Sequence, residues 1–321
     1  MGRRQFWLFL LPAALLLHLG FWLLYVKVIS AGGLQKQKAA LYLQKNNKAA
    51  FCWIMGDSHP MMSLNPAILQ GSFNWAGTSE YYFLTWFKLR KLLQENPAPG
   101  IIVLPLDLHS YSAQGNALLL NHELDDTFWC RLAGPEALSR FGAGNEFLRW
   151  WISARYFPYA GQFYRLFSFR KKEGFDADPQ GFVPATGNLA YLPGKEVKTQ
   201  AKSRFDSHFG KFPAVDSLQV KALDSIISLC RQKAIRLVLV SFPLSKEYRH
   251  LASGHPGLHQ ADSISTLRKK TNHYLNYSGF FKDNGNFFSD PDHLSPEGAR
   301  IFSLAMRHAL DSIRKIPAGV R

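Results

Sequence analysis

The fold class is decided by the stretch Phe51-Cys52-Trp53-Ile54-Met55-Gly56-Asp57-Ser58-His59, an apolar run that turns polar directly after a glycine. A second apolar run, residues 101–106, is likewise followed by Asp107 and His109. Short strands that are apolar throughout are typical of parallel sheets covered on both faces. The two runs therefore predict an α/β protein with polar residues at the ends of its strands.

Strand-like and helix-like patterns alternate along much of the remaining chain. Two further strands and two amphipathic helices are expected, in the order strand, helix, helix, strand, at residues 71–76, 78–95, 217–233 and 235–240. A last helix is expected after Ser295, with Pro296 at its first position, where proline is favoured. This alternation predicts a three-layer α/β fold, in which helices cover both faces of a parallel sheet.

The N-terminal segment predicts a transmembrane helix. Residues 6–26 carry no formal charge, and as a helix they would span about 30 Å, enough to cross a bilayer core. The run is long for a cleaved signal peptide, and no small-residue cleavage site follows it. We expect an anchor in residues 1–30, a polar helical stalk in 31–50 and one folded domain in 51–321. The flanking lysines and arginines do not decide the orientation of the anchor.

The alternation of strands and helices fails at about residues 111–213. This part is rich in aromatic residues interleaved with arginine and lysine, and it includes Trp129, Trp150 and Trp151. We expect a helical, aromatic cap inserted into the domain. Two interpretations stay open: the aromatic side chains are the cap's own core, or they line a substrate cleft suited to sugars or acidic polymers.

The net charge and the spacing of the cysteines limit the classes of partner and cofactor that we expect. The net charge of +15 favours an anionic partner, but the basic residues are scattered and form no long run. We therefore expect an anionic membrane surface and no nucleic acid. None of the three cysteines lies in a CxxC pattern, which argues against a zinc site. No metal or other cofactor is expected.

Polar residues from separate segments are expected to meet at one edge of the sheet, because ligands of open α/β sheets bind beyond the carboxyl ends of the strands. Ser58 follows the first strand, and the string Asp290-Pro291-Asp292-His293 directly precedes the last helix. A serine nucleophile needs a base that a third group orients. We expect Ser58 to be the nucleophile, His293 the base and Asp290 the orienting acid. Asp292 is expected to be a loop or capping carboxylate.

The combination of Gly56-Asp57-Ser58 with Asp290-x-x-His293 resembles the SGNH (GDSL) hydrolase superfamily over about residues 51–110 and 215–314. The resemblance implies a flavodoxin-like α/β fold and a serine esterase or acyltransferase. It places the family's nucleophile on Ser58, its oxyanion glycine on Gly77, and its acid and base on Asp290 and His293.

One family block departs from the pattern. The family's third block carries an asparagine that donates to the oxyanion, whereas the matching place here reads Leu106-Asp107-Leu108-His109. Asn74 or His109 is the expected substitute donor, and Asp107 is expected beside them among the oxyanion- and substrate-binding residues. With this departure, the chain resembles membrane-anchored SGNH-like proteins of bacterial envelopes, which move acyl groups onto teichoic acid or exopolysaccharide. This likeness implies acyl transfer to, or removal from, an envelope glycan, an extracytoplasmic (periplasmic) catalytic domain, and a membrane acyl-transfer partner.

Two other classes of function stay open. Asp57, His59, Asp292 and His293 carry the oxygen and imidazole ligands of a metal-dependent phosphoesterase, although the further Gly-Asp and Gly-Asn-His segments of such enzymes are missing. The unusual third block also allows a catalytically inert envelope assembly protein that keeps only the SGNH shell.

Overall fold

The computed structural model describes residues 3–24, 34–44, 50–114, 129, 145–157, 176–210, 215–255, 271 and 273–315. Its centre is a sheet of five parallel strands in the order β2-β1-β3-β4-β5, the order of flavodoxin-like sheets. The strands are β1 (Cys52–Ile54), β2 (Ser72–Asn74), β3 (Ile101–Pro105), β4 (Arg236–Ser241) and β5 (His273–Asn276). The predicted α/β class and parallel sheet are confirmed.

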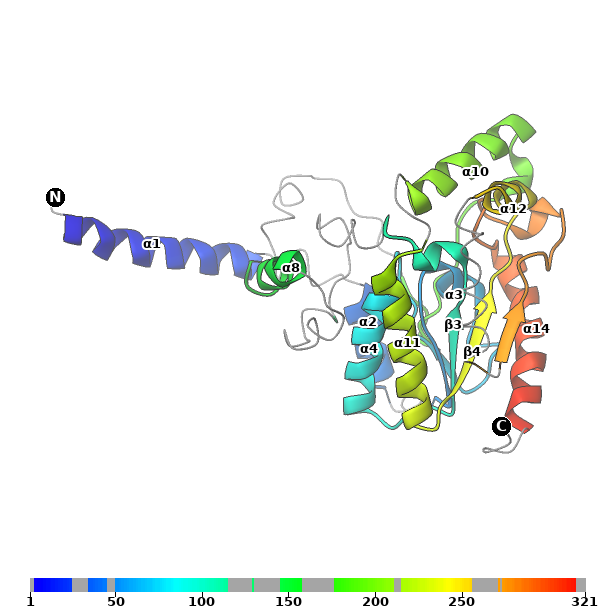
Figure 1. Cartoon of the computed structure of the whole chain (residues 1–321), viewed down its shortest axis with the longest axis horizontal. Helices are drawn as coiled ribbons and strands as arrows, with labels where there is room; N and C mark the ends of the chain where they lie inside the picture. The colour runs from blue at the N-terminus through cyan, green and yellow to red at the C-terminus, as the bar shows by residue number, and fades with distance from the viewer. Residues whose placement is uncertain are drawn as a thin grey trace.

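Alternate side chains of each strand pack on opposite faces of the sheet. Trp53 and Ile102 face α4 (Tyr82–Glu95) and α11 (Ser217–Gln232), which form one hydrophobic core. Ile54 and Val103 face the other core, which α14 (Pro296–Lys315) covers with its apolar stripe. Helices therefore lie on both faces of the sheet, as Figure 1 shows. Loops follow the strands at their carboxyl ends.

The other helices surround this sandwich. Short 3-10 turns lie at η3 (Leu108–Tyr111), η5 (Leu189–Tyr191) and η7 (Gly285–Phe287). The remaining α-helices are α1 (Arg3–Leu24), α2 (Leu34–Tyr42), α3 (Ser58–Ser63), α8 (Asn145–Tyr156), α10 (Gly194–Phe209) and α12 (Lys246–Ser253).

Two details of the predicted elements are wrong. The helix expected over residues 78–95 begins at Tyr82, because Ser79 adopts a left-handed backbone with φ of 52°, which no right-handed helix accommodates. Strand β5 was not predicted, since its four residues are only partly buried and carry no apolar run. The expected cap at the last helix is confirmed: Ser295 Oγ accepts the Gly298 N–H at 3.2 Å.

The N-terminal region differs from its prediction. Among the described residues, no helix combines the length and the apolar character that crossing a membrane requires, so the transmembrane anchor expected in residues 1–30 is not found. The segment expected as a stalk contains α2, which packs into the folded domain. Leu34, Gln35, Lys38 and Tyr42 are all buried there. At least this part of residues 31–50 belongs to the domain core.

The described part of the predicted cap favours the core interpretation of its aromatic residues. Trp129, Phe147, Trp150 and Trp151 are buried in the same cluster as Phe83 of α4. Residues 115–128, 130–144 and 158–175 of the expected cap lie outside the described residues. Phe147, Trp150 and Trp151 of α8 therefore extend the core on one side of the sheet, whereas Tyr156 at the end of α8 is exposed. Helix α10 supplies the part of this region that reaches the candidate site.

Candidate active site

The turn after β1 presents Ser58 at the carboxyl edge of the sheet. Gly56 has a φ of 110°, and a Cβ atom there would lie 2.3 Å from Pro105 Cδ at the end of β3. Only glycine allows this close approach. Asp57 then caps α3 by accepting the His59 N–H at 2.9 Å. Ser58 is thereby fixed as the first residue of α3 beside the neighbouring strand.

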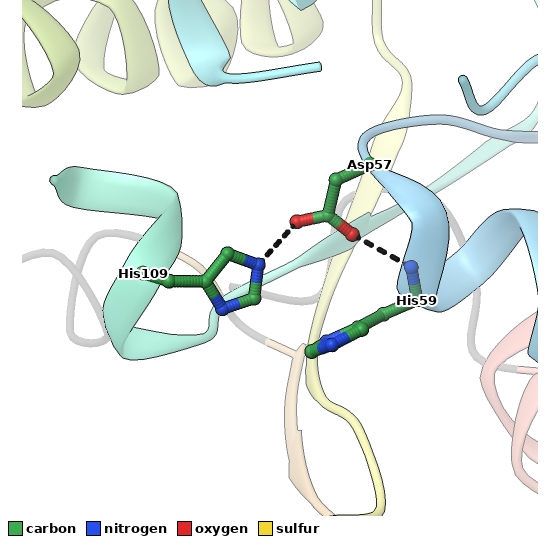
Figure 2. Close-up of side chains that lie close together, drawn as sticks. All are labelled: Asp57, His59 and His109. Atoms are coloured by element: carbon green, nitrogen blue, oxygen red, sulfur yellow. Dashed lines mark hydrogen bonds and ion pairs between the residues drawn. The ribbon is translucent and has the colours of Figure 1, made fainter. Parts of the chain in front are cut away.

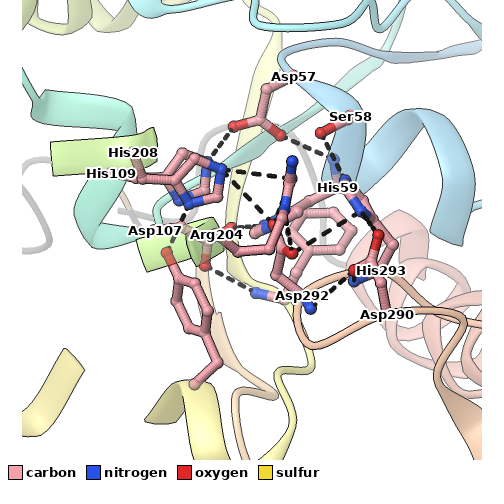
Figure 3. Close-up of polar contacts among 12 residues, drawn as sticks. Asp57, Ser58, His59, Asp107, His109, Arg204, His208, Asp290, Asp292 and His293 are labelled. Carbon is pink, nitrogen blue, oxygen red and sulfur yellow. Dashed lines mark hydrogen bonds and ion pairs between the residues drawn. The ribbon is translucent and has the colours of Figure 1, made fainter. Parts of the chain in front are cut away.

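Ser58, His293 and Asp290 form a continuous chain of hydrogen-bonding groups (Figure 3). Ser58 Oγ lies 2.8 Å from His293 Nε2, and His293 Nδ1 lies 2.8 Å from Asp290 Oδ2. The other oxygen of Asp290 accepts the N–H groups of Asp292 and His293, at 3.0 Å and 2.9 Å. Backbone N–H groups thus fix the position of Asp290. When His293 carries its proton on Nδ1, its Nε2 atom is free to accept the hydroxyl proton of Ser58. The structure brings the three expected catalytic residues together.

A pocket of about 520 Å³ opens in front of this triad. Hydroxyl, amide, imidazole and guanidinium groups lie among the side chains that line it. The lining residues are Asp57, Ser58, Met62, Thr78, Ser79, Tyr81, His109, Gln114, Arg204, Ser207, His208 and His293. The polar groups of this lining can form hydrogen bonds to a hydroxyl-rich substrate.

Of the four expected oxyanion residues, Asn74 has its side chain bound to backbone groups. Its side-chain amide donates to the carbonyl oxygens of Pro60 and Leu64, both at 3.0 Å, and of Met61 at 3.3 Å. Its Oδ1 accepts the Ala76 N–H at 3.1 Å. The residue is wholly buried and ties α3 to the end of β2. The side chain of Asn74 thus binds backbone groups, and an oxyanion role would require these bonds to open and stays a prediction.

Gly77 lies on the loop beside the nucleophile turn, but its N–H donates to the Gly56 carbonyl at 2.9 Å. An oxyanion role for Gly77 would require this bond to open and stays a prediction. Within the described part of the chain, the Ser58 N–H has no hydrogen-bond acceptor. The Ser58 N–H is thus the available donor at the nucleophile.

Asp107 and His109, the other two expected oxyanion residues, belong to two buried carboxylate–imidazole pairs. Asp57 Oδ2 lies 2.9 Å from His109 Nε2, the contact drawn in Figure 2. Asp107 Oδ2 lies 2.9 Å from His59 Nδ1, and its Oδ1 accepts the Phe242 N–H at 3.0 Å. Asp107 is therefore a partner of His59 and is not among the residues that line the pocket in front of the triad. His109 lines the pocket, so its expected place at the site is supported.

Asp292 lies at the centre of a charge network and is not the simple loop carboxylate expected from the sequence. Arg204 of α10 donates to both of its oxygens, from Nε and Nη2, at 2.7 Å each. Its Oδ2 also lies 3.5 Å from the Nε2 atoms of His59 and His208. On the far side, His208 Nδ1 lies 2.5 Å from the Tyr248 hydroxyl. Figure 3 shows how this network fills the space behind the triad.

Arg204 and His208 were not among the residues expected at the site. They lie four positions apart on α10, so that both face the same side of a helix. Such spacing is common on surface helices and by itself gives no functional signal. Their role follows only from the packing of α10 over the strand ends.

The network shifts several pKa values. Burial alone would lower the pKa of His59, but its hydrogen bonds to Asp107 and Asp292 raise that pKa well above 6.5. Burial and the neighbouring His109 lower the pKa of His208 well below 6.5. Burial would raise the pKa of Asp292, but His293, His59 and Arg204 hold it well below 3.8. At neutral pH, His59 is therefore charged, His208 neutral and Asp292 ionised.

Among the residues that the structure describes, two groups of side chains could hold a metal ion: Asp57, His59 and His109, and His59, Asp292 and His293, each with ligand atoms within 4.8 Å of one another. In the second group, a guanidinium already binds both oxygens of Asp292. A cation there would lie beside the charge of Arg204, which opposes binding. In the first group, the ring nitrogens already have carboxylate partners: His109 Nε2 lies 2.9 Å from Asp57 and His59 Nδ1 lies 2.9 Å from Asp107. The donor atoms therefore fit a hydrogen-bonded network better than a metal centre.

Comparison with protein-family models finds no match for this chain, and comparison with curated proteins finds no relative. The geometry of the site is therefore the basis for proposing a function.

Proposed function

We propose that the protein is an SGNH-type serine acyl hydrolase or O-acyltransferase that acts on acyl esters of a cell-envelope glycan. The observation that carries this proposal is the chain Ser58–His293–Asp290, in which two contacts of 2.8 Å join nucleophile, base and acid. Three residues from two distant segments supply the parts that activation of a serine hydroxyl needs.

In the proposed first half-reaction, Ser58 Oγ attacks the carbonyl carbon of the ester while His293 Nε2 takes the hydroxyl proton. Asp290 stabilises the imidazolium through Nδ1. The tetrahedral intermediate then collapses, the C–O bond to the leaving group breaks, and His293 returns the proton to the leaving alkoxide. An acyl ester on Ser58 and a free alcohol result.

In the second half-reaction, His293 takes a proton from water or from a glycan hydroxyl, whose oxygen attacks the acyl-serine. The Ser58–acyl bond breaks and the serine recovers its proton. The polar side chains Thr78, Gln114 and Ser207 in the pocket lining support a carbohydrate as substrate, because hydroxyl and amide groups can form hydrogen bonds to sugars. The Ser58 N–H is the donor that supports the developing oxyanion.

The test is covalent labelling with a fluorophosphonate probe followed by mass spectrometry of the labelled peptide. We expect label on Ser58 and none in Ser58→Ala or His293→Ala. Ser312→Ala is the control, because Ser312 is an exposed serine of α14 away from the pocket and its loss should leave labelling unchanged. Label that persists in Ser58→Ala would exclude this mechanism. Absence of any label in the wild type would favour the inert assembly protein.

We also propose a location at the cell membrane, with the catalytic domain on the extracytoplasmic side. Support comes from α1, on which large apolar side chains are exposed, among them Phe9 at 69% and Leu16 at 70%. Exposed apolar surface of this kind marks a membrane or protein contact. Carbonate extraction of membranes and protease accessibility of the full chain test this location. Recovery in the soluble fraction without detergent would contradict it.

A further inference from the structure

Helix α2 sends two polar side chains into the interior of the domain, directly beneath one wall of the candidate site. Lys38 is 0% exposed and Gln35 is 1% exposed. Lys38 Nζ donates to the Ala76 carbonyl at 2.6 Å, and Gln35 Nε2 donates to the Trp75 carbonyl at 3.3 Å. Both contacts bind the loop that joins β2 to α4.

Lys88 of α4 and Trp129 also form hydrogen bonds to Gln35, and Lys88 binds the same β2–α4 loop. Lys88 donates to the Trp75 carbonyl, to Glu80 and, at 3.3 Å, to Gln35 Oε1. The indole N–H of Trp129 donates to Gln35 Oε1 at 2.9 Å. Gln35 therefore serves as a junction between α2, α4 and the loop.

The loop connects α2 to the nucleophile. The residue after Ala76, Gly77, donates its N–H to the Gly56 carbonyl two positions before Ser58. A Cβ atom at Gly77 would lie 2.3 Å from Gln35 Nε2, so α2 packs closely on this point. The next two residues, Thr78 and Ser79, line the pocket. A short path of contacts thus runs from Lys38 through the loop to the turn that carries Ser58.

We propose that Lys38 and Gln35 are positioning residues, which fix the β2–α4 loop against the nucleophile turn and make α2 part of the catalytic unit. The proposal rests on the acyl-transfer function proposed above. A wholly buried lysine is a poor choice for stability alone, because an apolar residue of similar volume is often as stabilising or more so. A side chain that donates a hydrogen bond to a backbone carbonyl instead holds the loop in one conformation. Displacement of a site by about 1 Å costs roughly 100-fold in rate.

The experiment compares three variants of the full chain. Lys38→Met keeps the length of the side chain and removes its donor, Lys38→Arg keeps a charged donor, and Lys36→Met is the matched control on the exposed face of α2. For Lys38→Met we expect kcat for an ester substrate to fall about 10- to 100-fold with KM within about twofold. Lys38→Arg should recover part of kcat, and Lys36→Met should equal the wild type.

Amide hydrogen exchange of residues 74–79 gives a second readout that does not need activity. We expect faster exchange in Lys38→Met and unchanged exchange in Lys36→Met. Equal kcat and equal exchange in these two variants would overturn the positioning role. A wild type without turnover or probe labelling would overturn the proposed function, while the exchange comparison would still decide the role of Lys38. If Lys38→Met does not fold, Gln35→Met decides: lower kcat or faster exchange supports the proposal, and wild-type values of both overturn it.

Discussion

Arg204 of α10 and Asp292 form a bidentate ion pair between that helix and the loop that carries His293. Arg204 Nε lies 2.7 Å from Asp292 Oδ1 and Nη2 lies 2.7 Å from Oδ2, so that the guanidinium matches the carboxylate edge to edge. Asp292 is wholly buried in its side chain and directly precedes His293. The pair therefore anchors α10 to the loop that carries the proposed base.

Arg204→Met should destabilise the protein by about 3 kcal/mol, because it leaves the buried carboxylate of Asp292 without its main partner. Chemical denaturation of the variant measures this loss. Lys202→Met on the same helix is the control: its ion pair with Asp206 is exposed and should contribute only about 0.5 kcal/mol. Equal effects of the two variants would contradict the anchoring role of Arg204.

Ser58→Ala and His293→Ala should each lower kcat/KM for an ester substrate by at least about 1000-fold, and the double variant should be no worse than Ser58→Ala. The residues act as one unit, so that removal of either abolishes activation of the nucleophile. Steady-state kinetics of the three variants measure this coupling. Losses that multiply in the double variant would show that the two side chains act independently.

Asp290→Asn should lower kcat by about 1000- to 10,000-fold, since an amide beside Nδ1 favours the wrong imidazole tautomer. The KM should change little, because Asp290 does not line the pocket. Asp283→Asn is a matched control at an exposed acidic residue paired with Lys246 and Arg249. A normal kcat in Asp290→Asn would remove Asp290 from the proposed triad.

Stability should be greatest near pH 6.5, the ordinary pKa of histidine, because two buried histidines have opposite shifts. The raised pKa of His59 contributes stability that is fully present below 6.5 and is lost as pH rises through its folded-state pKa. The lowered pKa of His208 contributes stability that is present above 6.5 and is lost as pH falls through its folded-state pKa.

Denaturation from about pH 4.5 to about pH 9 tests these signs. His59→Gln should flatten the alkaline side of the curve, and His208→Gln should flatten the acidic side. A loss of slope on the opposite side in either variant would contradict the assignment of the charged and neutral rings.

Asn74→Ala should destabilise the protein by about 3 kcal/mol, because it leaves buried backbone groups of α3 and Ala76 without hydrogen bonds. The control Asn65→Ala removes one bond to the Ala67 N–H at an exposed turn and should cost about 0.5 to 1 kcal/mol. If Asn74→Ala kept full stability and lost only kcat, Asn74 would be a site residue after all.

The sequence predicted the parts of the molecule that local patterns encode. The largely apolar runs at residues 51–55, 101–106 and 235–240 each overlap an observed strand, because burial on both faces disfavours polar side chains. Ser58 and Asp290-x-x-His293 could be paired because both strings adjoin elements whose ends meet at one edge of a parallel sheet. The left-handed Ser79 and the partly polar β5 escaped prediction, since neither leaves a periodic signal.

The sequence by itself thus determined the α/β class, the parallel strands and the three residues expected to react. Only the tertiary structure decided what surrounds them. It bound the Asn74 side chain to backbone groups, buried Lys38 of the expected stalk beneath the loop beside the site, and paired Arg204 with Asp292 across 88 positions of sequence. The physical reason is that burial and charge pairing depend on which surfaces meet, and residue spacing along one element carries no information about its distant partner.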